Sequence, residues 1–244
     1  MTLAARHDGG LEWLSLSNPP VNALTVELIE ELIRALGRCA NDPNVSVVVL
    51  AGIGKHFCAG ADLAGQQRAW REGRAGPADL GDALYDAMLS FPKPLVGAAH
   101  GSVAGAGLSM LCCCDLAIAA SGTRISLPEV KVGVLGGISH ARTALGKAIV
   151  NYLALTGLPL EVERIGTGGL FLEIVDGADL QECASQIARK IADNDSMSVL
   201  YTKQCTRATE GIGQLEGYSR EHALSEQLRA QGTTDLLVTK FLTK

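Results

Sequence analysis

The chain has 244 residues, of which 47% are hydrophobic and 19% are charged, and its formal net charge is −5 at pH 7. The apolar content excludes a disordered chain, and the acidic balance, with no Lys/Arg-rich stripe, argues against a nucleic-acid binder. The length fits one large domain, or a domain that carries a helical appendage.

The first hundred residues alternate strands with helices. Residues 11–16 and 45–50 are predicted strands, the second because of its β-branched run. Between them, Thr25 is the predicted N-cap of a helix whose apolar residues recur at helical spacing. A second short strand is expected at 56–59, and the polar segment 65–81 is expected to be a mobile surface segment.

Residues 95–114 form an apolar stretch that is long enough to span a bilayer. Two prolines precede it, four glycines interrupt it, and no basic flank follows it. A buried strand, a glycine-rich turn and a helix explain the same residues, so we predict no membrane span.

The second half of the chain becomes increasingly helical. The pattern predicts strands at 115–120 and 125–127, then helices at 148–155 and from a capping box at 179–182 to about 193. Gly157 suits the C-cap of the first helix. From residue 193 to the end, the sequence is almost wholly helical. The prediction is an α/β body at 1–190 and a C-terminal helical region at 191–244.

The seven cysteines include no spaced CxxC pair, which is typical of reduced core cysteines in a cytosol-like compartment. Cys112, Cys113 and Cys114 are adjacent and point in different directions, so they make a poor metal site and we predict no metal. The first ten residues hold no apolar run like that of a signal peptide. We therefore expect a cytoplasmic protein.

Three segments could carry chemistry: Phe57–Leu63 (FCAGADL), His100–Gly107 (HGSVAGAG) and Leu127–Glu129 (LPE). A glycine-rich turn into a helix leaves N–H groups unpaired, which can hold an anion or a developing oxyanion. The same turn also occurs as a plain strand–helix connection. The glycines do not fit dinucleotide spacing and no Walker lysine follows, so phosphate binding is the weaker functional interpretation.

Two further groups extend this pattern. Gly60 lets the backbone bend and expose the N–H of Ala61, although the same bend could be a plain turn. Glu129, at the end of a predicted strand in apolar surroundings, would have a raised pKa if it were buried, which suits a general acid or base. A lone glutamate is more often a solvated charge.

Taken together and in order, these segments resemble the enoyl-CoA hydratase/isomerase (crotonase) superfamily over nearly the whole chain. The resemblance also rests on Asn18–Leu24 (NPPVNAL), Pro92-Lys-Pro94, Leu155-Thr-Gly157 and the end of the chain, Phe241–Lys244 (FLTK). It implies a crotonase-like spiral of ββα units whose C-terminal helices mediate trimerisation. It also implies acyl-CoA thioester substrates with no separate cofactor, and a homotrimer or dimer of trimers with neither nucleic acid nor membrane as partner.

The resemblance assigns roles to particular positions. The oxyanion-hole N–H groups match Ala61 and Ala106. The CoA-binding backbone matches Ala59, Gly60, Ala61, Asp62 and Leu63. Phe241 and Lys244 match the terminal residues that lean on the CoA of a neighbouring subunit.

The sequence departs from the family pattern near the expected acid–base residues. Hydratases of the family use two glutamates, of which Glu129 matches the second, while Ser109 occupies the position of the first. Ala106 replaces a glycine of the oxyanion turn, which narrows the allowed backbone. After Gly133, the chain reads VLGGISH to His140 and lacks the proline and double glycine common in hydratases.

These departures leave several functions open. With one acid, Glu129 could move a proton between carbons of an unsaturated acyl-CoA, as an isomerase, or assist a concerted addition of water, as a hydratase. The Glu-then-Gly-Gly-x-x-His pattern is also similar to ring-cleaving C–C hydrolases of β-keto acyl-CoA, in which His140 would matter most. A further alternative is a non-catalytic acyl-CoA-binding or protein-binding paralogue.

Overall fold

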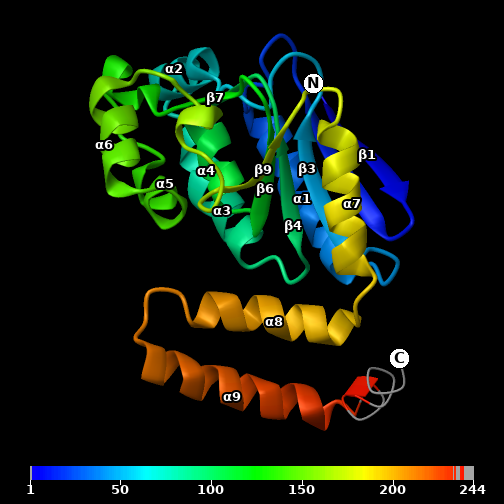
Figure 1. Cartoon of the computed structure of the whole chain (residues 1–244). Helices are drawn as coiled ribbons and strands as arrows, with labels where there is room; N and C mark the ends of the chain where they lie inside the picture. Colours follow the sequence, from blue (N-terminus) through cyan, green and yellow to red (C-terminus); the bar gives the residue numbers. More distant parts are fainter. Residues whose placement is uncertain (1, 233, 235–236, 239–244) are drawn as a thin grey trace.

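The computed structural model describes residues 2–232, 234 and 237–238. Its strands form two sheets (Figure 1). In the larger sheet the order is β1-β2-β3-β4-β6-β9, with β1 antiparallel to β2 and the remaining neighbours parallel. Its strands are β1 (Thr2–Asp8), β2 (Leu11–Ser17), β3 (Val47–Gly52), β4 (Leu95–Ala99), β6 (Leu116–Ala120) and β9 (Phe171–Val175). The smaller sheet, in the order β5-β7-β8, contains β5 (Ser102–Ala104), β7 (Arg124–Ser126) and β8 (Leu160–Glu161).

Helices cover both faces of the larger sheet and continue beyond it. The α-helices are α1 (Val26–Asn41), α2 (Leu63–Arg71), α3 (Gly81–Leu89), α4 (Ala106–Cys112), α5 (Ile138–Ala144), α6 (Lys147–Thr156), α7 (Leu180–Ala192), α8 (Ser196–Ala208) and α9 (Gln214–Ala230). Short 3₁₀ helices are η1 (Pro77–Leu80), η2 (Pro128–Val132) and η3 (Val162–Arg164).

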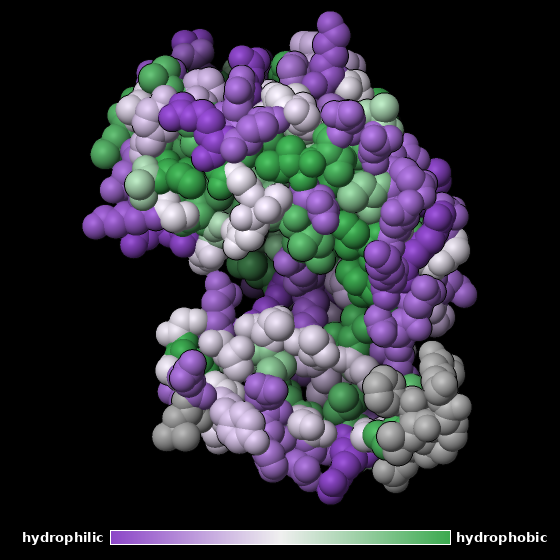
Figure 2. Space-filling model, viewed as in Figure 1, coloured by the Kyte–Doolittle hydropathy of each residue, from purple (hydrophilic) through white to green (hydrophobic). Residues whose placement is uncertain are grey.

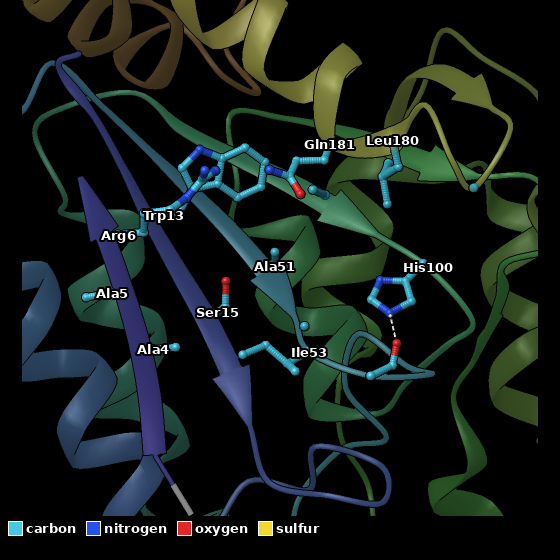
Figure 3. Close-up of a pocket in the computed structure, with 14 residues that line it drawn as sticks. Ala4, Ala5, Arg6, Trp13, Ser15, Ala51, Ile53, His100, Leu180 and Gln181 are labelled. Carbon is cyan, nitrogen blue, oxygen red and sulfur yellow. Dashed lines mark hydrogen bonds between the residues drawn. The ribbon is translucent and has the colours of Figure 1, made fainter. Parts of the chain in front are cut away.

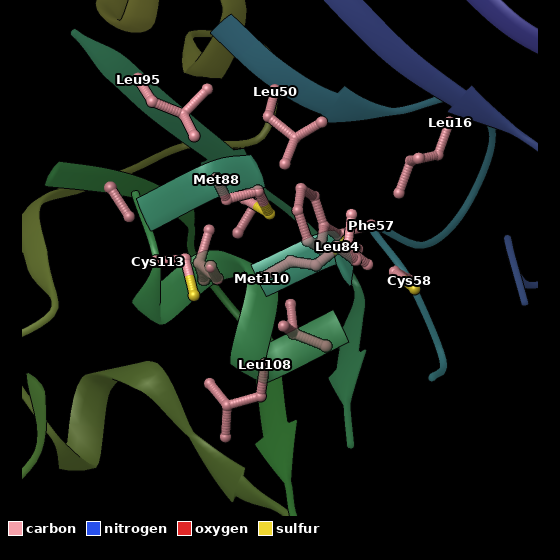
Figure 4. Close-up of a cluster of buried hydrophobic side chains, with 14 of the residues drawn as sticks. Leu16, Leu50, Phe57, Cys58, Leu84, Met88, Leu95, Leu108, Met110 and Cys113 are labelled. Atoms are coloured by element: carbon pink, nitrogen blue, oxygen red, sulfur yellow. The ribbon is translucent and has the colours of Figure 1, made fainter. Parts of the chain in front are cut away.

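The core lies mainly between the larger sheet and helices α1, α3 and α4. Figure 4 shows Leu50 and Leu95 of the sheet facing Met88 of α3 and Met110 of α4, with Phe57 between them. The opposite face packs against Leu180, Ala184 and Ala188 of α7. Burial on both faces explains why β3 and β4 read as continuous apolar runs rather than as alternating patterns.

Helices α8 and α9 form a separate layer beside the main body, residues 2–192 (Figure 1). Figure 2 shows the surface hollowed between this layer and the body, where a cavity of about 560 Å³ is lined by parts of α4, α5 and α8. The predicted division of the chain near residue 190 stays a prediction.

Most of the predicted elements are confirmed. Thr25 caps α1, since its hydroxyl accepts a hydrogen bond from the Leu28 N–H at 3.3 Å. Gly157 caps α6 in the left-handed conformation, with φ 62°. The apolar stretch 95–114 divides into β4, β5 and α4, and no helix of the described residues is long and apolar enough to cross a membrane.

The segment 65–81 lies mostly on the surface, as predicted, but it is largely helical rather than irregular. Its polar residues hold it in place: the buried Gln66 amide donates to Asp79 Oδ2 at 3.0 Å and accepts from the Ala78 N–H at 2.7 Å. Asp79 also accepts from the Gly76 N–H at 2.8 Å. Residues twelve or thirteen apart in sequence therefore fix α2 against η1.

Three smaller expectations also need correction. The strand predicted at 56–59 is only an isolated bridge from Cys58 to Val103. The predicted capping box does not form, because the Asp179 side chain makes no capping hydrogen bond. Glu129 lies within η2, directly after β7, rather than at a strand end. In addition, strands β1, β5, β8 and β9 and helices α2, α3 and α5 were not predicted.

Candidate active site

One cavity of about 480 Å³ brings together the three segments singled out in the sequence. The turn around Gly60 forms one wall, the start of α4 and η2 form a second, and α3 forms a third. The lining residues that matter below are Ala61, Ala106, Glu129, Tyr85, Leu63, Asp82 and Lys131.

The turn at Gly60 and Ala61 is fixed on both sides by Leu24. The Leu24 N–H donates to Gly60 O at 2.8 Å, and the Asp62 N–H donates to Leu24 O at 2.9 Å. This pairing skips the Ala61 N–H, which makes no backbone hydrogen bond among the described residues. Gly60 has φ +99°, a conformation that strongly favours glycine.

The motif Asn18–Leu24 acts through Asn22, which is almost fully buried. Its side-chain amide donates to Ile53 O at 2.9 Å and to His56 O at 2.8 Å. These bonds tie the loop that carries Leu24 to the end of β3. The motif therefore supports the Gly60 turn.

The start of α4 lies against this turn. A Cβ placed on Gly60 would come within 3.6 Å of the Ala106 nitrogen. Gly105, at φ +52°, precedes that nitrogen and donates its own N–H to Ser126 O at 3.0 Å. The Ala106 N–H makes no backbone hydrogen bond among the described residues, so the two adjoining walls each contribute one free donor to the cavity.

Glu129 reaches the same point from η2. A Cβ placed on Gly105 would come within 2.5 Å of Glu129 Oε1, so a side chain at position 105 would displace the carboxylate. Oε2 is buried and has no hydrogen-bond partner among the described residues. Burial raises the pKa of Glu129, which suits a group that alternately accepts and donates a proton.

Ser109 is fully buried one turn into α4, and its hydroxyl donates a long hydrogen bond of 3.4 Å to Gly105 O. The backbone at Gly137 closes over it, since a Cβ there would lie 3.0 Å from Ser109 Oγ. His140, on α5, lines the neighbouring cavity beside α8 instead of the site cavity. It meets the site through the ring of Tyr85, at a centroid distance of 4.4 Å.

Of the described residues expected to contact CoA, Ala59, Gly60, Ala61 and Leu63 line the cavity, whereas Asp62 does not. Leu63 is exposed at the start of α2, and Asp62 caps that helix by accepting from the Ala64 N–H at 3.1 Å. The Ala59 N–H donates to Val21 O at 3.0 Å, which fixes the approach to the turn. The predictions for Phe241 and Lys244 lie outside the described residues.

Sequence reasoning missed Tyr85, Asp82 and Lys131, which also line the cavity. Asp82 and Lys131 are exposed and stand at its rim. Asp82 and Tyr85 lie on α3, and only the tertiary position of that helix brings them to the site. Lys131 follows Glu129 by two residues in η2, so its place could have been inferred once Glu129 was chosen.

A larger cavity of about 660 Å³ lies on the α7 side of the sheet (Figure 3). Its lining has no carboxylate, and its one imidazole, His100, is engaged with Gly54 O at 3.0 Å. This cavity therefore lacks a carboxylate that could act as an acid or base, as Glu129 could in the smaller cavity. Among the described residues, no cluster of His, Cys, Asp or Glu could hold a metal ion.

Comparison with known proteins identifies similar sequences and folds. A family model described as enoyl-CoA hydratase/isomerase matches residues 6–235. The chain is 28% identical to the 2,3-dehydroadipyl-CoA hydratase of Escherichia coli K12, over 95% of this chain and 91% of that protein. It is also 28% identical to the carnitinyl-CoA dehydratase of Proteus mirabilis, over 86% and 82% of the two chains.

Among solved structures, the enoyl-CoA hydratase of Bacillus anthracis superposes with a TM-score of 0.91 at 24% identity. The match covers 100% of this chain and 96% of that one. The crotonase-like α/β fold expected from the sequence is therefore confirmed.

Proposed function

The chain belongs to the enoyl-CoA hydratase/isomerase family, and on that premise we propose that it adds water reversibly to the double bond of a 2-enoyl-CoA thioester. The proposal rests on one observation: Glu129, whose Oε2 is buried without a hydrogen-bond partner among the described residues, lines the same cavity as Ala61 and Ala106, whose N–H groups make no backbone hydrogen bond there. Those N–H groups bind the thioester oxygen, and Glu129 is the acid and base.

The chemistry follows from this arrangement. As the oxygen of water attacks Cβ, the π electrons move toward the thioester, whose oxygen gains negative charge. Two preorganised N–H donors stabilise that enolate without reorganising, which is often the largest contribution to catalysis. Glu129 takes one proton from the water and delivers it to Cα, so that the carboxylate is regenerated. CoA enters as part of the substrate, and no separate cofactor is needed.

Hydration, rather than isomerisation, is supported by the names of two relatives, a hydratase and a dehydratase. Isomerisation is the second candidate, because one buried carboxylate is enough to move a proton between Cα and Cγ. Ring cleavage assisted by His140 is disfavoured, because His140 lines the neighbouring cavity and reaches the site only through Tyr85. Trimeric assembly and a cytoplasmic location remain predictions.

The test is the variant Glu129→Gln, assayed with crotonyl-CoA by loss of the conjugated-thioester absorbance. Removing the acid–base group should lower kcat by about 10²–10⁴-fold while the Kd for a CoA ligand stays near that of the wild type. Glu30→Gln, an exposed carboxylate on α1, is the matched control and should keep the full rate. Full activity in Glu129→Gln would show that Glu129 is not the acid–base residue.

A further inference from the structure

A further wall of the candidate active-site cavity is built by α2 and η1. Leu63, at the start of α2, and Pro77 and Ala78 of η1 line the cavity. Helix α3, which brings Tyr85 to the same cavity, begins at Gly81, directly after η1. The position of η1 against α2 therefore sets this wall and the start of the next one.

One buried side chain joins α2 to η1. Gln66 of α2 is only 2% exposed. Its amide donates to Asp79 Oδ2 at 3.0 Å and accepts from the Ala78 N–H at 2.7 Å. The same Asp79 oxygen accepts from the Gly76 N–H at 2.8 Å. A Cβ placed on Gly76 would lie 2.5 Å from Gln66 Oε1, so the amide fills the space over that glycine. We call the paired side chains of Gln66 and Asp79 the clamp.

The clamp is polar, although an apolar contact would also bury surface between two elements. A buried amide costs free energy unless both its N–H and its C=O are hydrogen-bonded, and in Gln66 both are. Hydrogen bonds are directional, so the clamp fixes one position of η1 relative to α2. The Gln66 amide, followed by the Gly76 N–H, lowers the pKa of Asp79, which is therefore ionised at neutral pH and makes charge-assisted bonds.

We propose that Gln66 and Asp79 are positioning residues that hold a preformed wall against the carbon chain of the CoA thioester and thereby set the affinity for substrate. The inference rests on the proposed function and deepens it. Neither side chain lines the cavity, so both act through Leu63, Pro77 and Ala78, which do. Because the clamp consists of the chain's own groups, the substrate does not have to order this wall, which lowers the entropic cost of binding.

The test changes the polarity of the clamp and leaves its shape. Gln66→Glu replaces the donor to Asp79 by a second carboxylate, and two carboxylates at hydrogen-bond distance repel each other. The Kd for butyryl-CoA, measured by calorimetry, and the KM for hydration of crotonyl-CoA should both rise about tenfold, as for the loss of a hydrogen bond to a charged group. The kcat should stay near that of the wild type, because the acid–base group and the N–H donors are unchanged.

A double variant tests the pairing itself. When Gln66→Glu is combined with Asp79→Asn, the new amide at position 79 can donate to the new carboxylate at position 66, which reverses the original bond. The Gly76 N–H loses its charged acceptor, so the Kd should recover most of the tenfold loss rather than all of it. A glutamine that mattered only for its volume would not be rescued by a change thirteen positions away.

Gln186→Glu is the matched control, because Gln186 of α7 donates to Glu182 at 2.9 Å on the exposed surface. The same change of charge there should leave Kd and KM unaltered. Gln66→Met, which removes the clamp's hydrogen bonds without adding a charge, gives the same comparison of Kd if Gln66→Glu does not fold.

Three results would overturn the inference: an unchanged Kd in the Gln66 variants, a fall in kcat at unchanged Kd, or a double variant that binds as weakly as Gln66→Glu. Measuring Kd requires no turnover. Wild-type protein that binds butyryl-CoA but does not hydrate crotonyl-CoA would therefore contradict the proposed function, while the comparison of Kd values would still decide the role of the clamp.

Discussion

The candidate active-site cavity and the joint between α8 and the main body both bury ionisable groups, but these groups differ in their hydrogen-bond partners. In the cavity, Glu129 Oε2 has no partner among the described residues. At the joint, the buried Lys203 of α8 pairs with Asp115 Oδ2 at 2.8 Å and donates to Lys93 O at 2.6 Å. Asp115 also accepts from the Leu95 N–H at 2.7 Å.

The pKa directions alone would not distinguish the two places. Burial raises the pKa of Glu129 and lowers the pKa of Lys203, so each is pushed toward its neutral form. The difference lies in the partners, because Asp115 opposes the effect of burial on Lys203. A satisfied buried charge stabilises a joint, whereas an unsatisfied one leaves hydrogen-bonding capacity for a substrate.

The largest expected effect comes from removing one free N–H donor of the candidate active site. Ala106→Pro removes a free N–H at the first position of α4, where proline is well tolerated. Because no folded-state hydrogen bond is lost, stability should change little. Losing one oxyanion donor should lower kcat/KM for crotonyl-CoA by about 10²–10³-fold. Ala106→Ser, which keeps the N–H, is the control, and a folded proline variant with full activity would place the thioester oxygen elsewhere.

The second prediction concerns a loss of stability rather than a loss of activity. Lys203→Met removes the cation of a buried pair and leaves Asp115 without its closer cationic partner. Breaking such a pair typically costs about 3–5 kcal/mol, and we expect about 3, since Asp115 keeps Arg207 at 3.4 Å. Urea unfolding at one fixed protein concentration measures this loss. Arg34→Met, at an exposed pair on α1, is the control and should change the unfolding free energy by under about 1 kcal/mol.

The kcat of the Lys203→Met variant completes that test. If the joint is structural, folded Lys203→Met should keep the wild-type kcat. A variant that unfolds at the wild-type urea concentration would show that the pair contributes no net stability. The comparison between a satisfied and an unsatisfied buried charge would then fail on its structural side.

The sequence predicted the parts of the site that depend on local backbone. Gly60 and Gly105 have positive φ angles and Glu129 follows a proline, so the local pattern made all three candidates, while the family resemblance assigned their roles. Tyr85 could not be found in this way. It lies on a helix placed by long-range bonds such as Gln66–Asp79, and these join residues whose pairing no local pattern reveals.

The same limit applies to the rest of the fold. Strand β1 has the sequence TLAARHD, which does not alternate and holds one large apolar side chain, so its pairing with β2 rather than its pattern makes it a strand. Lys203 likewise lies in an ordinary helical sequence. Only the approach of α8 to Asp115, 88 positions earlier in the numbering, shows that this lysine is buried.

The smallest predicted effect is a change with pH in the free energy of unfolding. The pKa of Glu129 is raised above 4.5 in the folded state by burial. Between 4.5 and that higher value, the folded protein holds a proton that the unfolded chain releases, so the wild type loses stability as pH rises. Glu129→Gln has no such titration. Its advantage in unfolding free energy should therefore appear as pH rises above 4.5 and level off beyond the folded-state pKa, at on the order of 1 kcal/mol or less, because water reaches part of the carboxyl group.

Glu163 provides a control of opposite sign. Its pKa is lowered, first by the Gly122 N–H at 2.6 Å, with help from the Ser121 hydroxyl at 2.8 Å. Glu163→Gln should therefore lose stability relative to the wild type at neutral pH, and the deficit should shrink as pH falls through the lowered pKa. Urea unfolding of the three proteins from pH 3 to pH 8 gives both differences. If the Glu129→Gln difference were flat with pH, or followed the sign of Glu163→Gln, then the Glu129 carboxylate would have partners in solution, and the contrast with the α8 joint would disappear.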